Sequence, residues 1–419
     1  MKLDIAHLMR PGTLSLTSLP PLSVYVHLPW CLKKCPYCDF NSHEWRAPLA
    51  ATSGTVPVNK EPAPLPESQY LDAVCADLES SLQLVWGRPV HSIFIGGGTP
   101  SLFSPQAIAR LISDLRARLP LVPDCEITLE ANPGTFEKDR FHAFRQAGVT
   151  RLSIGVQSFN DKHLQSIGRV HDAAQAVAAV QEAAQAFDTF NLDLMYALPG
   201  QSLSDLQHDL QAALNLQPPH LSIYHLTIEP NTLFAKHTPV DLPQDDLAYD
   251  MLDLITDGTD AQGLKRYEVS AFAKEGHRCW HNTNYWQFGD YLGLGAGAHS
   301  KLSFAHRIYR LVRHREPGLY MQKATTDSAV AQCHEVSRSE LPFEFMLNAL
   351  RLKEGIPAHA FSERTGLPMS AIEKNLHIAQ EQGLLTVAGM TIKPTAKGFD
   401  FLSDLQSLFL PETDPIRAG

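Results

Sequence analysis

The sequence has no second pair of cysteines that could complete a structural zinc site. Such a site usually takes four ligands from two CxxC pairs, and only one cysteine cluster occurs here. The other cysteines are scattered, at Cys75, Cys125, Cys279 and Cys333, and a total of seven is odd. This is not the pattern of a disulfide framework, so we expect a reducing compartment and a cytoplasmic location.

Long apolar runs and an excess of positive charge are also absent. No run approaches the ~18 residues that a membrane-spanning helix needs, which leaves only peripheral membrane contact open. Residues 1–12 lack the apolar centre of a signal peptide, so no signal peptide is expected. The formal net charge of −10 argues against a general nucleic-acid binder, because such proteins are usually basic.

The chain does contain a regular alternation of strand and helix patterns between residues 22 and 226. The predicted strands are 23–28, 91–95, 125–129, 151–156, 191–195 and 220–226. The predicted helices are 70–86, 105–119, 136–147, 173–187, 202–216 and 245–264. Such alternation predicts an α/β protein with a parallel sheet and outer helices, and the pattern alone allows a doubly wound sheet or a barrel.

The remaining segments divide the chain into further parts. The polar and aromatic stretch 280–286 lies between two predicted short strands, 266–270 and 291–294, and the last unit reads as three helices, a hairpin and a terminal helix (396–408). The last unit suggests a winged helix, but residues 343–419 hold nine acidic and seven basic side chains, which disfavours DNA binding. The expected domains are a disordered leader (1–21), a barrel core (22–240) with a surface loop (46–66), a barrel extension (241–335) and a C-terminal unit (336–419).

Three cysteines within eight residues, Cys31, Cys35 and Cys38, form a CxxxCxxC motif. Thiolates are soft ligands that suit iron–sulfur clusters. Three of them would leave one iron of a [4Fe–4S] cube without a protein ligand, and a small molecule could chelate that iron. The alternative, buried cysteines that are close by chance, is the weaker one because free cysteines rarely cluster in cytosolic proteins.

Glycines and polar residues lie at the carboxyl ends of the predicted strands, where barrel enzymes have their active sites. Gly96–Gly98 follow the second strand, Glu130 the third and Gln157 the fourth, and Asp193 lies within the fifth. No Gly-Lys-Ser/Thr follows the glycines, so they form either a ligand-contacting backbone or a tight turn, and not a P-loop. Asp193 could alternatively make a structural hydrogen bond, and Arg169 could be an ordinary surface charge.

Residues 24–43, 96–100, 151–159 and 193–200 closely resemble the HemN-like branch of the radical S-adenosylmethionine (SAM) proteins, over about residues 22–408. Within this branch the chain is similar to the heme chaperones. Phe40 stands where the oxygen-independent coproporphyrinogen III oxidases have a further cysteine, and residues 281–286 match the HNxxYW motif of the chaperones. The oxidase remains the alternative, and the sequence does not decide whether SAM is cleaved.

The resemblance implies a partial (β/α)6 TIM-like barrel with a C-terminal helical, winged-helix-like domain. It implies a [4Fe–4S] cluster on Cys31, Cys35 and Cys38, and heme that is passed to respiratory hemoproteins. A homodimer is left open. The implied SAM contacts are Tyr25, Tyr37, Gly97, Gly98, Thr99, Glu130, Gln157, Arg169 and Asp193.

His281 is the expected heme ligand, because histidine is a common axial ligand and this motif is the one that the family associates with heme. Trp280, Tyr285 and Trp286 would supply flat faces to the porphyrin, while Asn282 and Asn284 would orient the imidazole or meet a propionate. The alternative is that the aromatic side chains are core packing and that His281 merely caps this packing. His43, just after the cysteines, is the nearest rival ligand.

Overall fold

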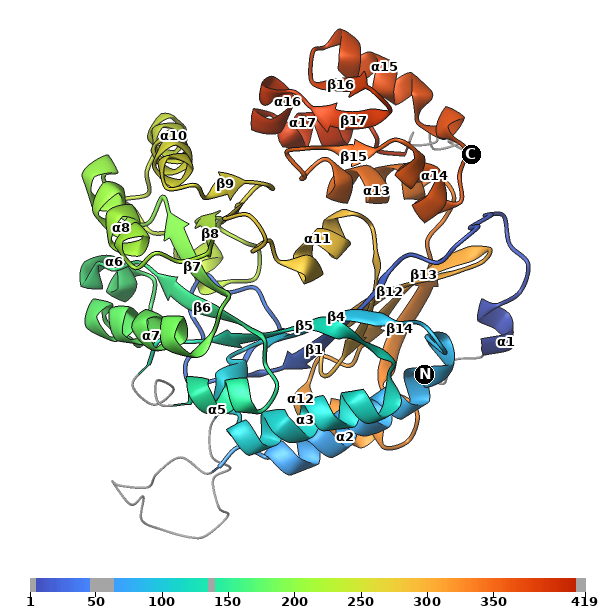
Figure 1. Ribbon diagram of the computed structural model, residues 1–419, viewed down its shortest axis with the longest axis horizontal. Helices are drawn as coiled ribbons and strands as arrows, with labels where there is room; N and C mark the ends of the chain where they lie inside the picture. Colours follow the sequence, from blue (N-terminus) through green and yellow to red (C-terminus); the bar gives the residue numbers. More distant parts are fainter. Residues whose placement is uncertain (1–4, 46–63, 135–139, 412–419) are drawn as a thin grey trace.

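The computed structural model describes residues 5–45, 64–134 and 140–411, and its centre is a curved sheet of six parallel strands (Figure 1). The six strands lie side by side in chain order. They are β1 (Leu22–Leu28), β4 (Val90–Gly97), β5 (Leu121–Ala131), β6 (Arg151–Gln157), β7 (Phe190–Tyr196) and β8 (His220–His225). This arrangement confirms the predicted partial barrel over the doubly wound alternative, whose strand order would reverse.

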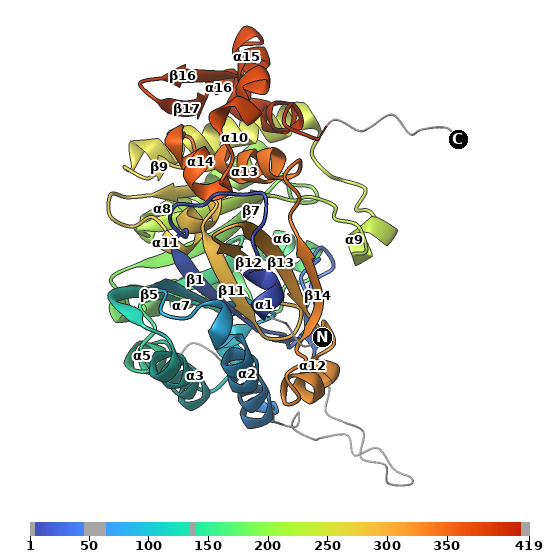
Figure 2. The same cartoon turned by 90° about the vertical axis from the view of Figure 1, so that its right-hand side faces the viewer.

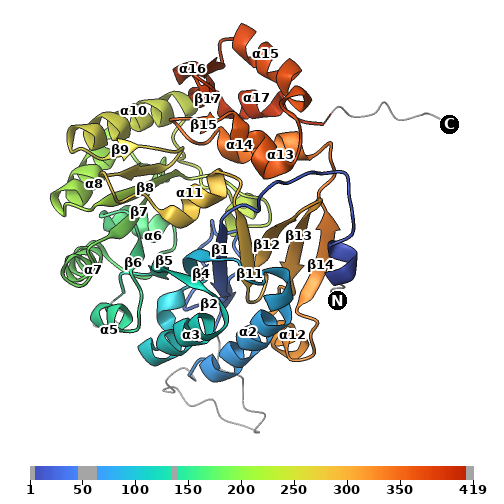
Figure 3. The same cartoon turned by 45° about the vertical axis from the view of Figure 1, so that its right-hand side comes forward.

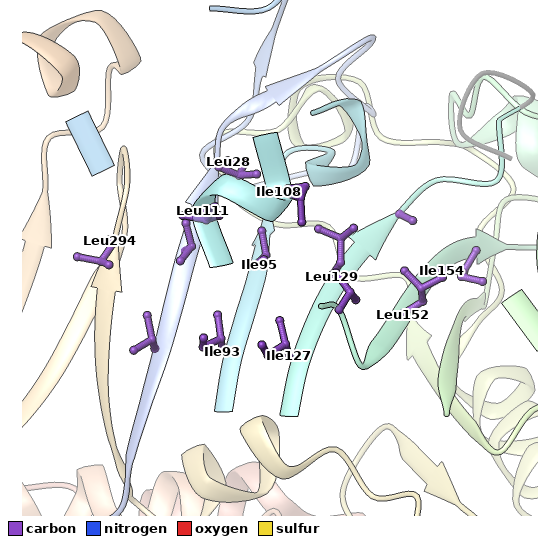
Figure 4. Packing of buried hydrophobic residues seen from close by; sticks show 14 of the residues in the cluster. Leu28, Ile93, Ile95, Ile108, Leu111, Ile127, Leu129, Leu152, Ile154 and Leu294 are labelled. Carbon is purple, nitrogen blue, oxygen red and sulfur yellow. The ribbon is translucent and has the colours of Figure 1, made fainter. Parts of the chain in front are cut away.

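Helices cover the outer face of the sheet (Figure 1). They are α2 (Glu67–Ser81), α3 (Pro105–Arg118), α5 (Phe141–Gln146), α6 (Asp161–Ser166), α7 (Ala173–Ala186), α8 (Leu203–Asn215) and α10 (Asp245–Ala261). The Ser104 hydroxyl caps the start of α3, and Ile108 and Leu111 are fully buried. Figure 4 shows these two side chains beside Ile95 of β4, so the core lies between the helices and the sheet.

The sheet continues past both edges of the six strands. β11 (Asp290–Leu294) pairs parallel with β1, and the antiparallel strands β12 (His299–Phe304), β13 (Arg307–Arg313) and β14 (Val330–Glu335) follow it. At the other edge lie β10 (Ala271–Ala273) and β9 (Lys265–Arg266), and α12 (Pro317–Ala324) packs on α2.

Strands β12 to β14 were not predicted, and for β12 and β13 their buried charges explain why. Lys301 of β12 is buried with its Nζ 3.0 Å from Oδ1 of Asp290, and the buried Arg313 of β13 pairs with Asp77 at 3.2 Å. A buried charge needs such a partner, and each partner lies elsewhere in the sequence. The charges therefore interrupt the apolar alternation by which a strand is recognised.

The polar and aromatic stretch of the sequence forms helix α11 (Trp280–Trp286), which lies between the sheet and the C-terminal unit (Figure 3). The side chain of Asn284 fixes this helix to the sheet. Its Nδ2 donates to the Ser23 Oγ at 2.9 Å and to the Asp290 carbonyl at 3.3 Å. The helix therefore approaches the inner face of β1 and β4.

The C-terminal unit packs above the sheet with a separate core (Figure 2). It comprises α13 (Leu341–Ala349), β15 (Ile356–Pro357), α14 (His359–Thr365), α15 (Glu373–Glu381), β16 (Leu385–Ala388), β17 (Thr391–Pro394), α16 (Ala396–Asp400) and α17 (Leu402–Ser407). A third strand, β15, joins the predicted hairpin, and the single predicted terminal helix is broken at Phe401.

The leader is ordered over its described part, which differs from the expected disorder. Residues Ile5–Leu8 form α1, and Leu14 and Leu16 are buried in the core of the C-terminal unit. The Leu16 amide donates to the Ala305 carbonyl at 3.0 Å, so the segment connects the β12–β13 turn to that unit. Most of the predicted loop 46–66 lies outside the described residues.

No helix in the described ranges is both long and apolar enough to span a bilayer.

Candidate functional site

The cysteine loop follows β1 and is fixed at its base by a short parallel pairing of β2 (Trp30–Cys31) with β3 (His43–Glu44). The Thr99 amide donates to the Trp30 carbonyl at 2.8 Å from one side. On the far side, the Phe234 amide of α9 (Leu233–Lys236) donates to the Pro36 carbonyl at 3.0 Å. Backbone contacts from three parts of the chain therefore position the thiols.

The glycine turn after β4 allows this loop to approach closely. A Cβ on Gly98 would lie 2.6 Å from the Trp30 carbonyl oxygen, and Gly97 has a φ of +127°. The two amides are engaged within the protein, since Gly97 donates to the Glu130 carboxylate at 3.1 Å and Gly98 to the Leu28 carbonyl at 2.8 Å. An amino group donates hydrogen bonds, so a ligand's amino group would have to meet carbonyl oxygens of this turn rather than its amides.

A cavity of about 300 Å³, which we call the cysteine cavity, opens at the carboxyl ends of β4 to β7. Its lining includes all three motif cysteines and eight of the nine residues expected to contact SAM. The eight are Tyr37, Gly97, Gly98, Thr99, Glu130, Gln157, Arg169 and Asp193. Tyr25 is the exception, because it lines a second cavity described below.

The sulfur atoms in this cavity lie among hydrogen-bonding groups. Thr99 Oγ1 donates to Cys31 Sγ at 3.5 Å, and Arg169 Nη1 donates to Cys35 Sγ at 3.6 Å. Burial raises the pKa of Cys31 to about 11. Within the described ranges, no three His, Cys, Asp or Glu side chains stand close enough to hold a single metal ion. Three thiols with donors to their sulfurs fit an iron–sulfur cluster, whose potential such hydrogen bonds tune.

Two half-buried carboxyl groups face the same cavity. Burial and the nearby Asp193 raise the pKa of Glu130 to about 8. Burial also raises the pKa of Asp193 to about 6, although hydrogen bonds from Ser153 at 3.0 Å and Asn191 at 2.8 Å oppose this. A cationic ligand would favour the ionised forms. The sulfonium and ammonium groups of SAM match this need.

Arg169 is half-buried, so it is not the surface charge that the sequence allowed. Its Nη2 donates to the Gly155 carbonyl at 2.7 Å and to the Asn132 side chain, while its Nε is buried without a hydrogen-bond partner in the part of the chain described. An unsatisfied buried donor is costly, and the carboxylate of SAM could satisfy it.

Gln157 adopts a strained backbone conformation with a φ of +67°. The strain occurs where the register between β6 and β7 shifts, between Gly155 and Gln157. Such conformations cost about 1–3 kcal/mol and cluster at functional sites. This register shift is a bulge that changes the direction of the end of β6, where Gln157 lines the cysteine cavity.

A second cavity of about 500 Å³, the histidine cavity, lies next to the first. The two share Phe40, Gly97 and Glu130 in their walls. The lining of the histidine cavity consists of Tyr25, His27, Asp39, Phe40, Asn41, Gly97, Glu130, His281, Tyr285, Tyr291, Gly297, His299 and Arg315.

His281 reaches this cavity from α11, as expected of a ligand. Its Nδ1 lies 2.9 Å from the Ser92 Oγ, and its amide donates to the Glu126 carboxylate at 3.1 Å. Burial lowers the pKa of His281 to about 3, so the ring is neutral at physiological pH. Ser92 therefore fixes the ring and leaves Nε2 as the nitrogen that can bind a metal.

The tryptophans beside and within the HNxxYW motif, Trp280 and Trp286, are mainly structural. Trp280 stacks on His91 with ring centroids 5.0 Å apart, and Trp286 lies 4.2 Å beneath the Arg351 guanidinium. Of the three aromatic side chains expected around a porphyrin, only Tyr285 lines the cavity.

The two asparagines of this stretch, Asn282 and Asn284, and the rival ligand His43 do not line the histidine cavity. Asn284 fixes the helix to the sheet, and Asn282 lines a small polar cavity deeper in the barrel. His43 lies 3.3 Å from the Asn41 side chain and lines neither cavity.

Several lining residues were missed from the sequence. Asn132 could have been recognised, because it follows Glu130 at the same strand end. Tyr224 lies near the end of a predicted strand without a recognisable motif. His299 begins β12 and Arg315 follows β13, two strands that were not predicted, so no local signal pointed to these residues.

Comparison with known proteins gives the family. Residues 25–213 match the Radical SAM superfamily, and residues 336–401 match the HemN C-terminal domain. The chain is 46% identical to the protein named heme chaperone HemW from Escherichia coli (strain K12), over 95% of this chain and 100% of that protein. It is 42% identical to the HemW of Haemophilus influenzae, over 94% of this chain and 99% of the relative.

A mouse relative, named radical S-adenosyl methionine domain-containing protein 1, mitochondrial, is 33% identical over 93% of this chain and 87% of that protein. The solved structure of coproporphyrinogen III oxidase (HemN) from Escherichia coli shares the fold, with a TM-score of 0.77 and 23% identity over 98% of this chain and 99% of that one. The identities over nearly the full length show that the chain belongs to the HemW family of the radical SAM superfamily.

Proposed function

We propose that this protein is a heme chaperone that binds heme in the histidine cavity and delivers it to respiratory hemoproteins. The observation that carries the proposal is the setting of His281. Its ring is neutral and held through Nδ1 by Ser92, and it faces a cavity of about 500 Å³. This is what an axial ligand to heme iron requires.

The cysteine cavity would hold the resident cofactors. Cys31, Cys35 and Cys38 would ligate a [4Fe–4S] cluster, and Glu130, Arg169 and Asp193 would bind the charged groups of SAM. When bound, the cluster supplies one-electron redox chemistry beside the SAM sulfonium. The cysteine loop positions the thiols, and Phe40, which lines both cavities, would stand between the cluster and the heme.

The chaperone role and the oxidase role predict different products. The fold is compatible with both, but Phe40 occupies the position at which the oxidases are expected to have a cysteine. We propose a cytoplasmic protein that carries heme and does not decarboxylate coproporphyrinogen.

The test uses protein purified without oxygen, with iron, sulfide and heme quantified on the same sample. We expect a Soret band on heme titration and no protoporphyrinogen after incubation with coproporphyrinogen III, SAM and a reductant. Transfer is then measured by mixing heme-loaded protein with a heme-free respiratory hemoprotein and separating the two. Protoporphyrinogen formation, or the absence of any Soret change, would contradict the proposed function.

A further inference from the structure

We propose that His299 is the second axial ligand of the heme, facing His281 across the histidine cavity. This inference rests on the proposed function and names the residue that completes the iron coordination. The two side chains come from different elements, His281 from α11 and His299 from the start of β12. Both line the same cavity.

The three histidines of the cavity differ in whether a ring nitrogen is free. His27 is held at both nitrogens, with the Tyr25 hydroxyl 2.9 Å from Nδ1 and the Asn41 carbonyl 3.0 Å from Nε2. His281 is held at Nδ1 alone. The side chain of His299 makes no hydrogen bond to any of the described residues. Only His281 and His299 can therefore offer a nitrogen to iron without breaking a protein hydrogen bond.

The protonation state of His299 also suits a ligand. Partial burial lowers its pKa, and the positive charges of Arg310 and Arg315 lower it further. A neutral imidazole is the form that binds a metal. Gly293 of the neighbouring β11 lies against the His299 backbone, where a Cβ would collide with the His299 carbonyl. Glycine at position 293 therefore allows β11 and β12 to approach closely, and this pairing fixes the backbone of His299 at the wall of the histidine cavity.

The rest of the cavity matches the chemistry of a planar tetrapyrrole with carboxylate side chains. The rings of Tyr285 and Tyr291 lie 4.8 Å apart and provide aromatic surface. Arg315 is exposed at the rim, and its guanidinium has no partner among the described residues, so it can pair with a propionate. Asp39, which lines the same cavity, carries a negative charge that would repel a propionate and so favour its pairing with Arg315.

The experiment compares His299→Ala, His299→Met and the control His334→Ala in full-length, cluster-loaded protein titrated with heme. His334 is exposed on β14 and lines neither cavity. Wild type should give a six-coordinate low-spin spectrum, and His299→Ala a five-coordinate one. Because loss of an outer-shell partner alone costs about 10–100-fold in metal affinity, His299→Ala should weaken heme binding by at least about tenfold.

His299→Met provides a readout that a purely structural role would not change. Replacement of one histidine by methionine should raise the reduction potential of the bound heme, as histidine–methionine ligation does in cytochromes c. If the spectrum, affinity and potential of both His299 variants match those of wild type while His281→Ala loses heme, the inference is wrong and the proposed function stands. If wild type binds no heme, the proposed function itself fails.

Discussion

The two cavities share part of their walls but contain opposite kinds of ionisable group, acids in one and imidazoles in the other. The cysteine cavity gathers ionisable groups, including the two carboxyl groups of Glu130 and Asp193, whose pKa values burial raises. The histidine cavity gathers imidazoles, and burial lowers the pKa of His27 and His281 well below neutrality. Desolvation favours the neutral form in both cases, but a neutral acid awaits a cationic ligand, whereas a neutral imidazole is already able to bind metal.

One scaffold can therefore hold two kinds of site at adjacent places on its inner face. The ends of parallel strands build the first site, and helix α11 with the β11–β12 pair builds the second. Apart from Glu130, which lines both cavities, each residue changed below should therefore act on at most one cavity and leave the other intact.

The largest effect should come from removing a cysteine. Cys35→Ala should abolish the visible absorbance of the cluster and its iron and sulfide, because no other thiol of the described residues lines the cysteine cavity beside Cys31 and Cys38. Cys75→Ala is the control, since Cys75 lies on α2 and lines neither cavity. Full iron content in Cys35→Ala would show that the cluster is ligated elsewhere.

A smaller effect is expected for Asp193→Ala. Loss of a hydrogen bond to a charged group should weaken SAM binding by about 1.5–3 kcal/mol, which equilibrium dialysis would detect as a roughly 10–150-fold rise in Kd. The matched control is Asp188→Ala, because the Asp188 side chain is 97% exposed. An unchanged Kd for Asp193→Ala would remove this residue from the SAM contacts.

The pH dependence of SAM binding tests the charge of Glu130. The free protein keeps the proton on Glu130 up to a pKa of about 8, and a cationic ligand favours the carboxylate, so binding releases a proton below that pH. The affinity should rise with pH by up to about tenfold per unit below pH 8 and then level off. Glu130→Gln should flatten this profile, while an unflattened profile would assign the titration to another group.

The smallest effect on ligand binding is expected at Trp286. Because this ring packs under Arg351 and does not line the histidine cavity, Trp286→Phe should leave the heme Soret band unchanged. Denaturant unfolding should show a loss of stability of about 0.5–2 kcal/mol, from a weakened cation–π contact. A shifted Soret band would mean that the ring contacts the porphyrin, as the motif alone suggested.

The same two cavities show how far sequence reasoning reaches. The parallel strands and the cysteine cavity were predictable, because motifs such as CxxxCxxC and Gly96–Gly98 directly follow strands with a clear pattern. As a heme site, the histidine cavity was predictable only at His281 and Tyr285, both from the HNxxYW motif. Its other wall depends on β12, where the buried Lys301 interrupts the strand pattern, and on the antiparallel pairing that places His299 opposite Gly293 of β11.

The most direct test of the account measures iron, sulfide and heme together in His281→Ala and Cys35→Ala, with His43→Ala as the control. If the cavities are separate, His281→Ala should keep its full iron and sulfide and lose or strongly weaken heme binding. Cys35→Ala should lose the cluster and keep the Soret band. An unchanged Soret spectrum in His281→Ala, or loss of both groups in either variant, would contradict the assignment of heme and cluster to separate cavities.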